Sequence, residues 1–326
     1  MQTRTLGNSD VKVSAVGLGC MSMTPFYGAP DDKESVATLH RAVELGVTFF
    51  DTATTYGNGD NEALIGPVLK EYRDKVTIAT KFGVYVTPKG IFYSGDPHYC
   101  HQCCDASLYR LKSDVIDLWY LHRVDPDTPV EETWGAMAEM VQAGKVRALG
   151  ICEVNPATLR KINAIHPVSA LQSEYSLWTR DPEGEVLDTC RELGVSLVPY
   201  SPLGRGFFTG TVTSQSDLRE GDRRTMFPRF TEENLKQNVP LLEVVRGIAD
   251  AKGCTLGEVA IAWVMAQGDD IIPIPGTRRR TYLEDNVGAA DVKLDDDDLA
   301  KLDQAFPRDA ATGHRLPEVQ QRYVNQ

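Results

Sequence analysis

The chain has 326 residues, of which 42% are hydrophobic and 25% are charged, and its formal net charge at pH 7 is -12. This composition is typical of a globular protein with a large core, and the acidic charge excludes a general role in binding nucleic acids or anionic membranes. No apolar run approaches the roughly 20 residues of a transmembrane helix, and no secretory signal is visible at the start, so we expect a cytoplasmic protein.

Short apolar runs alternate with amphipathic stretches along the chain, which is the pattern of βα units around a parallel sheet. In chain order, the predicted strands are residues 15–20, 48–53, 76–81, 116–122, 146–152, 170–175, 196–201 and 271–275. In ELGVTFF, QAGKVRALG and ELGVSLV, a glycine between helix and strand can end the helix in the left-handed conformation. Eight such units predict an α/β fold, a (β/α)8 TIM barrel that forms a single domain over residues 1–326. A doubly wound open sheet is the alternative.

Three stretches interrupt this repeat. Residues 83–97 follow the third predicted strand and residues 204–228 follow the seventh, and both are rich in glycine and read as long loops. In a barrel these loops emerge at the C-terminal face, where long loops usually build a site. The tail, residues 307–326, lacks periodicity, and we expect it either to drape over one face or to be partly disordered.

The seven cysteines are odd in number and thinly spread, which indicates reduced thiols and not a disulfide framework. The segment Cys100-His101-Gln102-Cys103-Cys104 contains groups that suit zinc, but no second ligand pair occurs at a suitable spacing. On a helix its three cysteines share one face, so we favour a half-buried helix face and predict no metal site. The acidic run 295–298 is likewise interpreted as a helix cap.

Ionisable residues stand directly after several predicted strands: Asp51, Lys81 and His122, with Tyr56 a few residues beyond Asp51. Each alone has a simple structural explanation, as a cap, a strand-end cation, a core histidine or a packing aromatic. Parallel strands of a barrel end at the same face, so all four are expected to meet at one mouth. A buried charge is costly unless it is paired, and Asp51 and Lys81 are therefore predicted to form an ion pair.

Seven motifs together resemble the aldo-keto reductase superfamily, most closely its aryl-alcohol-dehydrogenase or pyridoxal-reductase-like branch. They are GVTFFDTATTYG followed by Asn61-Glu62, TIATKFG, IDLWYLHRVDP, GKVRALGI, ALQSEYSLWTRD, VPYSPLGRGFFTG and IPIPGTRRRTYLEDN. The resemblance covers residues 5 to 306 and keeps the order of the family's motifs.

This resemblance implies reduction of a small-molecule aldehyde or ketone to an alcohol by hydride transfer from NADPH. Tyr56 would give a proton to the carbonyl oxygen, and Lys81 would stabilise the resulting tyrosinate. Asp51 would hold Lys81 in place, and His122 would orient the substrate oxygen.

The resemblance also implies a cofactor site, and the residues themselves offer one cation cluster for it. Arg278, Arg279 and Arg280 follow the last predicted strand and precede a helix, which is a natural seat for a phosphate, although a solvated basic turn is the alternative reading. By resemblance, Thr277 and Arg278 would hold the 2'-phosphate of the cofactor, and Asp285 and Asn286 would face its adenine. Tyr200 would lie against the nicotinamide ring, and Gln172 and its neighbour Ser173 would bind the carboxamide. Leu203, Gly204 and Arg205 would line the pyrophosphate. The full predicted set also contains Cys152, Ser201 and Gly276. No GxGxxG follows the first strand, so a Rossmann mode of binding is not supported.

Two positions depart from the family pattern. Cys152 stands where the branch usually has a serine, which weakens a contact to the carboxamide. Tyr282 stands where many relatives have another arginine, so NADH is kept as the less favoured cofactor.

The candidate substrate pocket is aromatic and largely apolar, which favours aryl or other hydrophobic carbonyls. Its predicted walls are Met23, Phe26, Tyr27, Phe82, Tyr85 and Trp178, each of which could equally be a core or loop-packing residue. One alternative function is an aldolase with Lys81 as a Schiff-base lysine and Tyr56 as its proton shuttle. Another is a binding or regulatory protein that keeps the cofactor site and turns over slowly. Nothing in the sequence indicates the oligomeric state.

Overall fold

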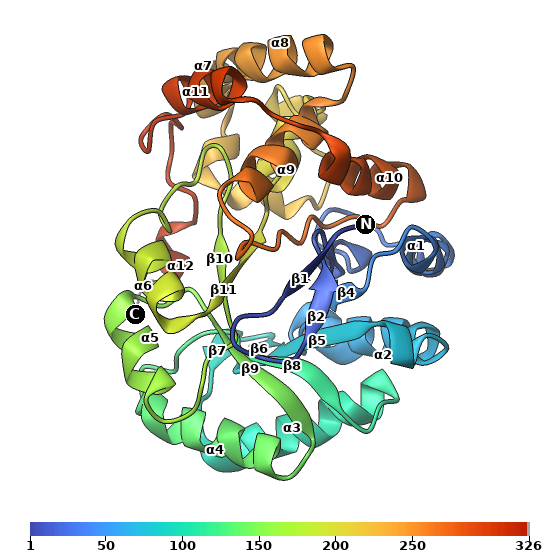
Figure 1. The fold of residues 1–326 in the computed structure, drawn as a ribbon, viewed down its shortest axis with the longest axis vertical. Coiled ribbons are helices and arrows are strands. Elements are labelled where there is room, and N and C mark those ends of the chain that lie inside the picture. The colour runs from blue at the N-terminus through green and yellow to red at the C-terminus, as the bar shows by residue number, and fades with distance from the viewer. Residues whose placement is uncertain (325–326) are drawn as a thin grey trace.

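The computed structural model describes residues 1–324, and its centre is a parallel sheet that wraps into a barrel (Figure 1). Seven strands lie side by side in the order in which they occur in the chain. They are β3 (Leu18–Gly19), β4 (Phe49–Asp51), β5 (Thr77–Phe82), β8 (Ile116–Leu121), β9 (Val146–Cys152), β10 (Ala170–Glu174) and β11 (Ser196–Tyr200). Parallel neighbours need long crossover connections, and here the connections run over the outside of the barrel.

The eighth predicted strand closes the barrel. Residues 271–276 form one parallel bridge to β11, between Ile271 and Leu197, and another to β3, between Gly276 and Gly19. The two prolines of this segment have no N–H to donate, which is why the pairing is reduced to isolated bridges. The predicted (β/α)8 barrel is confirmed, and the open doubly wound sheet is wrong.

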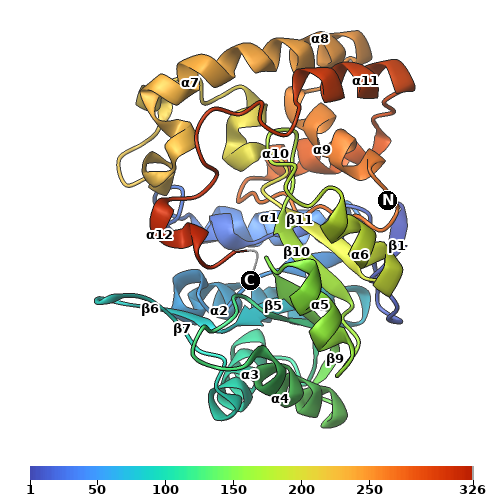
Figure 2. The same ribbon diagram turned by 90° about the vertical axis from the view of Figure 1, so that its left-hand side faces the viewer.

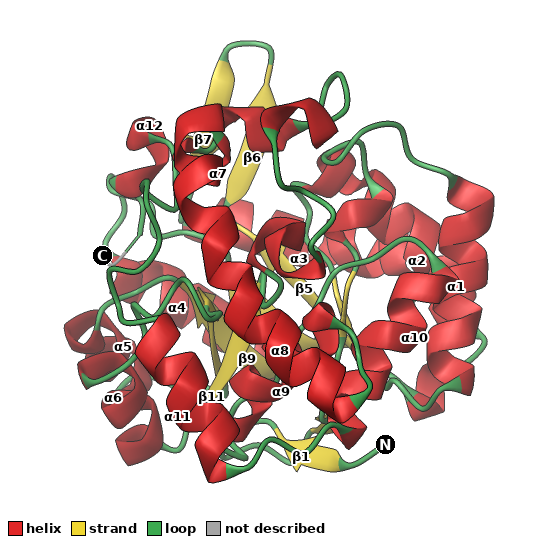
Figure 3. Ribbon diagram, turned by 90° about the horizontal axis from the view of Figure 1, so that it is seen from above, coloured by secondary structure: helices red, strands yellow, loops and turns green. Residues whose placement is uncertain are grey.

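Helices surround the strands on the outside of the barrel (Figure 3). They are α1 (Asp32–Glu44), α2 (Asp60–Lys70), α3 (Pro97–Leu111), α4 (Val130–Gln142), α5 (Pro156–Asn163), α6 (Glu185–Leu193), α7 (Glu232–Asn238), α8 (Leu242–Lys252), α9 (Leu256–Ala266), α10 (Arg280–Gly288) and α11 (Asp296–Ala305). A further short helix, α12 (Glu318–Gln321), belongs to the tail. The predicted glycine stops are left-handed, with φ of 83° at Gly46, 72° at Gly144 and 65° at Gly194. Asp295 and Asp298 form a capping box at the start of α11, which confirms the interpretation of the acidic run.

The barrel interior is packed with apolar side chains, including Phe49, Leu118 and Val198, none of which is exposed. Leu6 and Val13 join the same cluster from the hairpin of β1 (Thr3–Thr5) and β2 (Lys12–Ser14). The hairpin touches the start of β4, since the amide of Ser14 donates to the hydroxyl of Thr48 over 2.8 Å. The end of the barrel at which strands begin is therefore plugged, and the opposite end is left for a site.

The first predicted long loop is in part a β-hairpin. Within residues 83–97, β6 (Val84–Thr87) pairs in antiparallel fashion with β7 (Gly90–Tyr93). The prediction of a loop was wrong for these residues, because it rested on the Gly and Pro content of the segment. The stretches VYVT and GIFY consist largely of residues that favour strands. Figure 2 shows this hairpin projecting beyond the helices. Residues 204–228 form short turns, including η4 (Gly204–Thr209), η5 (Gln215–Asp217) and η6 (Arg223–Met226), as expected for a long loop.

The tail drapes over the C-terminal face of the barrel, which was one of the two expectations for residues 307–326. Tyr323 stacks on Tyr93 of β7, with ring centroids 3.9 Å apart, and Leu316 is buried. The expectation for the last two residues of the tail, 325 and 326, falls outside the described residues.

The cysteine-rich segment lies on α3, and Cys100, Cys103 and Cys104 are buried on its inner face, which confirms the helix-face interpretation. Within residues 1–324 no group of three or more His, Cys, Asp or Glu side chains is arranged to hold a metal ion. In the same range, no helix combines the length and the apolar character needed to span a bilayer.

Candidate active site

Three of the four predicted catalytic side chains meet around the ammonium group of Lys81. Lys81 lies near the end of β5 with no side-chain exposure, and its Nζ forms an ion pair with the carboxylate of Asp51 at the end of β4. The same Nζ donates to the Thr52 carbonyl oxygen over 2.8 Å and lies 3.5 Å from the hydroxyl of Tyr56. Neighbouring parallel strands thus bring together residues that are 30 positions apart, and the predicted ion pair is present.

Burial and charge set the protonation states at this centre. Burial opposes a charge on Lys81, but the Asp51 carboxylate outweighs it and holds the pKa of Lys81 above its usual value. Burial raises the pKa of Tyr56 to about 12, while the charge of Lys81 acts in the opposite direction. At neutral pH the site therefore contains a lysine cation beside a phenol that still carries its proton.

His122 follows β8 and faces Tyr56 edge-on, with ring centroids 6.1 Å apart. Burial, together with the positive charges of Arg123 and Lys81, lowers the pKa of His122 well below its usual value. The imidazole is therefore neutral at physiological pH. Its Nδ1 is buried and has no hydrogen-bond partner within residues 1–324. A neutral ring beside the phenol can orient a substrate oxygen without adding a charge.

Gln172 and Cys152 extend this centre, but Gln172 does so in a way that the sequence did not suggest. The amide of Gln172 donates one N–H to Asp51 over 2.9 Å, so its side chain supports the carboxylate, and its contact to the carboxamide stays a prediction. Cys152, at the end of β9, is buried beside it, and burial raises its pKa to about 12, so it is a neutral thiol. Tyr120 of β8 was missed, although its ring lies 5.7 Å from Lys81 Nζ.

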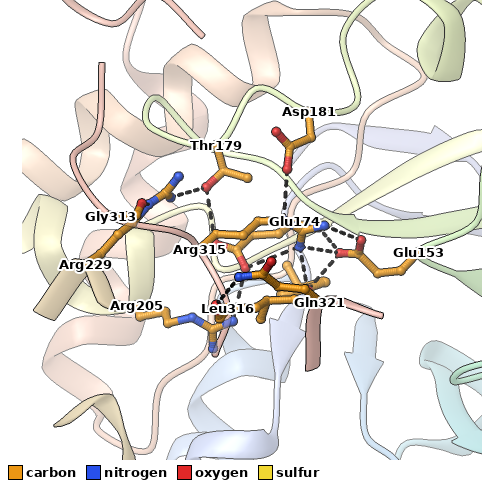
Figure 4. Close-up of polar contacts among 11 residues, drawn as sticks. Glu153, Glu174, Thr179, Asp181, Arg205, Arg229, Gly313, Arg315, Leu316 and Gln321 are labelled. Atoms are coloured by element: carbon orange, nitrogen blue, oxygen red, sulfur yellow. Dashed lines mark hydrogen bonds and ion pairs between the residues drawn. The ribbon is translucent and has the colours of Figure 1, made fainter. Parts of the chain in front are cut away.

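A second polar cluster lies over the ends of β9 and β10 (Figure 4). Arg315, from the tail, binds both carboxylate oxygens of Glu153 over 2.7 and 3.0 Å. The hydroxyl of Tyr200 donates to Glu153 over 2.8 Å, and Arg205 donates to Glu174 over 3.0 Å. Two predicted cofactor residues, Tyr200 and Arg205, are thus anchored by buried carboxylates.

Sequence reasoning missed the acids of this cluster and its tail arginine. Glu153 and Glu174 stand at strand ends, as Asp51 does, so the same criterion could have found them. Arg315 lies in an aperiodic tail, where no local pattern marks it. Burial would raise the pKa of Glu153, but the charge and hydrogen bonds of Arg315 hold it at about 2. Glu153 is therefore ionised, and its charge is balanced by the tail.

Several residues on this face hold a left-handed backbone that non-glycine residues rarely adopt. They include Glu153, Ser201 and Arg205, with φ of 56°, 52° and 57°. Gly204 is also left-handed, and a Cβ there would lie 2.6 Å from Nε1 of Trp178, so only glycine fits. Leu203 packs partly buried against the core. Such local strain is common at functional sites.

The predicted phosphate seat is a turn in which the hydroxyl of Thr277 accepts from the amide of Arg279 over 3.1 Å, just before α10. Arg280 is neutralised by Glu34, to which it donates twice over 3.1 Å. Arg278 donates to two carbonyl oxygens of the loop after β3, and neither it nor Arg279 has a carboxylate within ion-pair distance in residues 1–324. Burial, and then the charges of Arg279 and Arg219, lower the pKa of Arg278.

The remaining cofactor residues are consistent with a phosphorylated dinucleotide between the barrel mouth and α10. Asn286 is buried, and its Nδ2 has no hydrogen-bond partner within residues 1–324; the same is true of Nε of Arg205. A Cβ on Gly276 would lie 3.2 Å from the carbonyl oxygen of Gly19, so the backbone is closely approached there. Asp285 is exposed on α10. Buried polar atoms without partners are expected where a polar ligand completes the site.

The predicted substrate walls divide into accessible and packed residues. Phe82 has no exposed surface and stacks on Trp119, and Trp178 is 2% exposed and stacks on Phe207. This packing does not support either residue as a wall of a pocket. Met23 is also buried, at 2% exposure. Tyr27 is partly buried, with the guanidinium of Arg224 5.2 Å from its ring centroid, while Phe26 packs on it edge-on. Tyr85 lines a pocket of about 350 Å³ that also touches Thr54 and Asn58, near Tyr56.

Comparisons with known proteins agree on one family. A model described as the aldo/keto reductase family matches residues 15–306. The chain is 42% identical to a probable aldo-keto reductase 1 from Glycine max, over 100% of this chain and 96% of that protein. Among solved structures, the glycerol dehydrogenase AKR11B4 from Gluconobacter oxydans is similar with a TM-score of 0.86 and 26% identity, over 94% of this chain and 95% of that one. The holo form of aldo-keto reductase AKR11C1 from Bacillus halodurans gives a TM-score of 0.78 and 26% identity, over 97% and 100% of the two chains.

Proposed function

Since this chain belongs to the aldo/keto reductase family, whose members reduce carbonyls with nicotinamide cofactors, we propose that it reduces aldehydes or ketones to alcohols with NADPH and uses Tyr56 as proton donor. The observation that carries this proposal is the position of the Tyr56 hydroxyl, 3.5 Å from a buried lysine cation. We further propose that aryl and other hydrophobic carbonyls are its substrates, on the basis of the aromatic residues near the mouth.

The bound cofactor supplies the hydride, and the chain supplies the proton and the electrostatic environment. Tyr56 gives its proton to the carbonyl oxygen, and the adjacent ammonium of Lys81 stabilises the phenolate that remains. Asp51 and the Thr52 carbonyl keep Lys81 within reach, and Gln172 fixes Asp51. Neutral His122 orients the carbonyl oxygen without competing as a strong acid.

Binding of the cofactor is assigned to residues on both sides of the mouth. Thr277 and Arg278 would hold the 2'-phosphate at the start of α10, and Asn286 and Asp285 would face the adenine. Tyr200, with its hydroxyl held by Glu153, would present its ring to the nicotinamide. Ser201, Leu203, Gly204 and Arg205 would line the pyrophosphate, and Cys152 and Gly276 complete the set. Arg278 and Arg279 have no carboxylate partner in the described part of the chain, and these two cations favour NADPH over NADH.

The aldolase alternative is disfavoured by the state of Lys81. A Schiff base requires a neutral amine, whereas the Asp51 carboxylate keeps the pKa of Lys81 above its usual value. A binding or regulatory protein that turns over slowly needs no phenol beside the lysine cation. The reductase hypothesis therefore explains more of the site than the regulatory hypothesis does.

Tyr56→Phe tests the proposal. We expect NADPH oxidation with benzaldehyde to fall by about 10²- to 10⁴-fold, because the general acid is removed. Quenching of NADPH fluorescence on binding should change little, since the ring remains. Tyr109→Phe, at a side chain that is 73% exposed on α3, is the matched control.

Unchanged turnover in Tyr56→Phe would remove this residue as proton donor. If the wild-type protein oxidises no NADPH with any aldehyde, and borohydride labels Lys81 in the presence of a carbonyl compound, the aldolase is correct instead.

A further inference from the structure

Arg123 stands directly after His122 and is a partly buried cation without a carboxylate in ion-pair contact among residues 1–324. Its Nη1 donates to the carbonyl oxygen of His122 over 2.6 Å, and this is its one hydrogen bond in the part of the chain that the structure describes. In that same range no carboxylate lies within ion-pair distance of its guanidinium. Four of its five N–H donors are therefore left for another partner.

The buried acids nearest to Arg123 are already engaged. Glu153 accepts from Arg315, from the Tyr200 hydroxyl and from the amide of Glu174 over 3.0 Å. Glu174 accepts from Arg205 and from the hydroxyl of Thr179 (Figure 4). Among residues 1–324, Arg229 of this cluster also has no carboxylate partner, but it donates to the Thr179 hydroxyl and to the Gly313 carbonyl oxygen. Arg123 makes one hydrogen bond in that range and keeps more unused donors. A guanidinium with unused N–H donors can bind an anionic ligand through charge-assisted hydrogen bonds.

Arg123 lies near charged and polar groups of the second polar cluster. Burial acts to lower the pKa of Arg123, and the nearby Tyr200 and Glu153 outweigh it. The charge of Arg123 in turn acts on His122. Arg123 therefore lies close to this cluster and is hydrogen-bonded to the backbone of His122, the residue that would orient the carbonyl of a substrate.

We propose that Arg123 is a specificity-determining residue that binds a carboxylate on the carbonyl substrate, so that the enzyme favours aryl aldehydes with an acidic group. A single guanidinium matches the one charge and two oxygens of a carboxylate, with its fork of parallel donors. This inference rests on the proposed function. The substrate inferred in this way is an aldehyde that is aromatic near the reacting centre and carries a carboxylate at its far end, so it is not purely hydrophobic.

The test compares an aldehyde that carries a carboxylate, 4-carboxybenzaldehyde, with its uncharged methyl ester, methyl 4-formylbenzoate, and uses NADPH as cofactor. For wild-type protein we expect a higher kcat/KM with the carboxylate. In Arg123→Gln the kcat/KM for the carboxylate should fall by about 10- to 100-fold, through KM, because a charged hydrogen bond is lost. The kcat/KM for the ester should stay within about twofold of the wild-type value.

Arg123→Lys should recover part of the loss, because it restores the positive charge without the paired N–H donors of a guanidinium. Arg246→Gln, on the exposed face of α8, is the control for loss of one positive charge.

Three results would overturn the inference: an equal loss with both aldehydes, no loss with either, or a weakened NADPH affinity of Arg123→Gln in fluorescence quenching, which would assign Arg123 to the cofactor. If neither aldehyde is reduced by wild-type protein, the proposed function fails. Calorimetric titration with 4-(hydroxymethyl)benzoate then decides the inference separately: binding that is lost in Arg123→Gln supports it, and equal or absent binding in the two proteins contradicts it.

Discussion

At the scale of single residues, Lys81 keeps a full charge although none of its side chain is exposed. Asp51 supplies the counter-charge, the Thr52 carbonyl accepts a second hydrogen bond, and Gln172 holds Asp51 from the far side. A buried ion pair is stable when its remaining polar atoms are satisfied in this way. The charge of Lys81 is therefore fixed beside Tyr56 before any substrate arrives, and it need not be reorganised during the reaction.

The protonation state of Tyr56 leads to a prediction about pH. Because its pKa is raised to about 12, the phenol stays protonated throughout the neutral range, so reduction should be nearly constant between about pH 6 and 9. Oxidation of an alcohol needs the phenolate of Tyr56. At pH values below that pKa, the phenolate fraction rises about tenfold for each unit by which the pH increases, and the oxidation rate should rise with it. Steady-state rates in both directions, with saturating cofactor, measure this. A reduction profile that falls with an apparent pKa near 7 would point to another donor.

At the scale of elements, the tail is joined to the barrel by a buried charge pair and not by secondary structure alone. Arg315 contacts Glu153 and also Asp181, over 2.8 Å, while Tyr323 stacks on the β6–β7 hairpin. Glu153 in turn holds the hydroxyl of Tyr200. Docking of the tail is thereby connected to the ring on which the nicotinamide is expected to lie.

Arg315→Leu should destabilise the protein by about 3–5 kcal/mol at pH 7, because Glu153 is left buried without its partner. The pKa of Glu153 is depressed to about 2 from an ordinary 4.5, so its contribution is complete above 4.5 and is lost as the pH falls toward 2. This acid-dependent loss should be present in wild-type protein and absent in the variant. Urea unfolding at several pH values measures both effects.

Arg308→Leu is the matched control for this change, since Arg308 belongs to the same tail but is exposed. Equal stability of wild-type protein and Arg315→Leu would show that the tail is held by other contacts.

At the scale of the whole molecule, one end of the barrel is closed by the β1–β2 hairpin and the other carries the site, the long loops and the tail (Figure 1). The cofactor residues come from both margins of that end, from β9 to β11 on one side and from α10 on the other. A ligand that bridges these margins stabilises the folded state by mass action.

NADPH at about 100 times its Kd should stabilise the protein by about 2.7 kcal/mol and raise the Tm by several degrees. NADH at the same concentration should raise it less, since it lacks the group that Arg278 is expected to hold. Arg278→Glu should remove the difference between the two cofactors. Arg280→Gln is the control, because Arg280 is already paired with Glu34. Thermal unfolding followed by circular dichroism is the measurement, and an equal response to NADH and NADPH would contradict the assignment.

Local patterns in the amino-acid sequence were sufficient for the barrel and for the centre around Lys81. The short apolar runs of the strands and the glycine stops of the helices are set by neighbouring residues, and parallel strands must end at one face. Asp51, Lys81, Tyr56 and His122 could therefore be placed together without a structure, because each stands at or just after a strand end.

Tertiary structure alone decided the contacts between distant segments, which no local period encodes. Arg315 and Glu153 are 162 residues apart, and Gln172 and Asp51 are 121 apart, so neither pair leaves a pattern in the chain. Within residues 1–324, the lack of a carboxylate partner for Arg123 has the same origin, since it depends on which acids already pair with the tail and the long loop. Packing also turned Phe82 into the core, because its side of the strand faces helices and not the mouth.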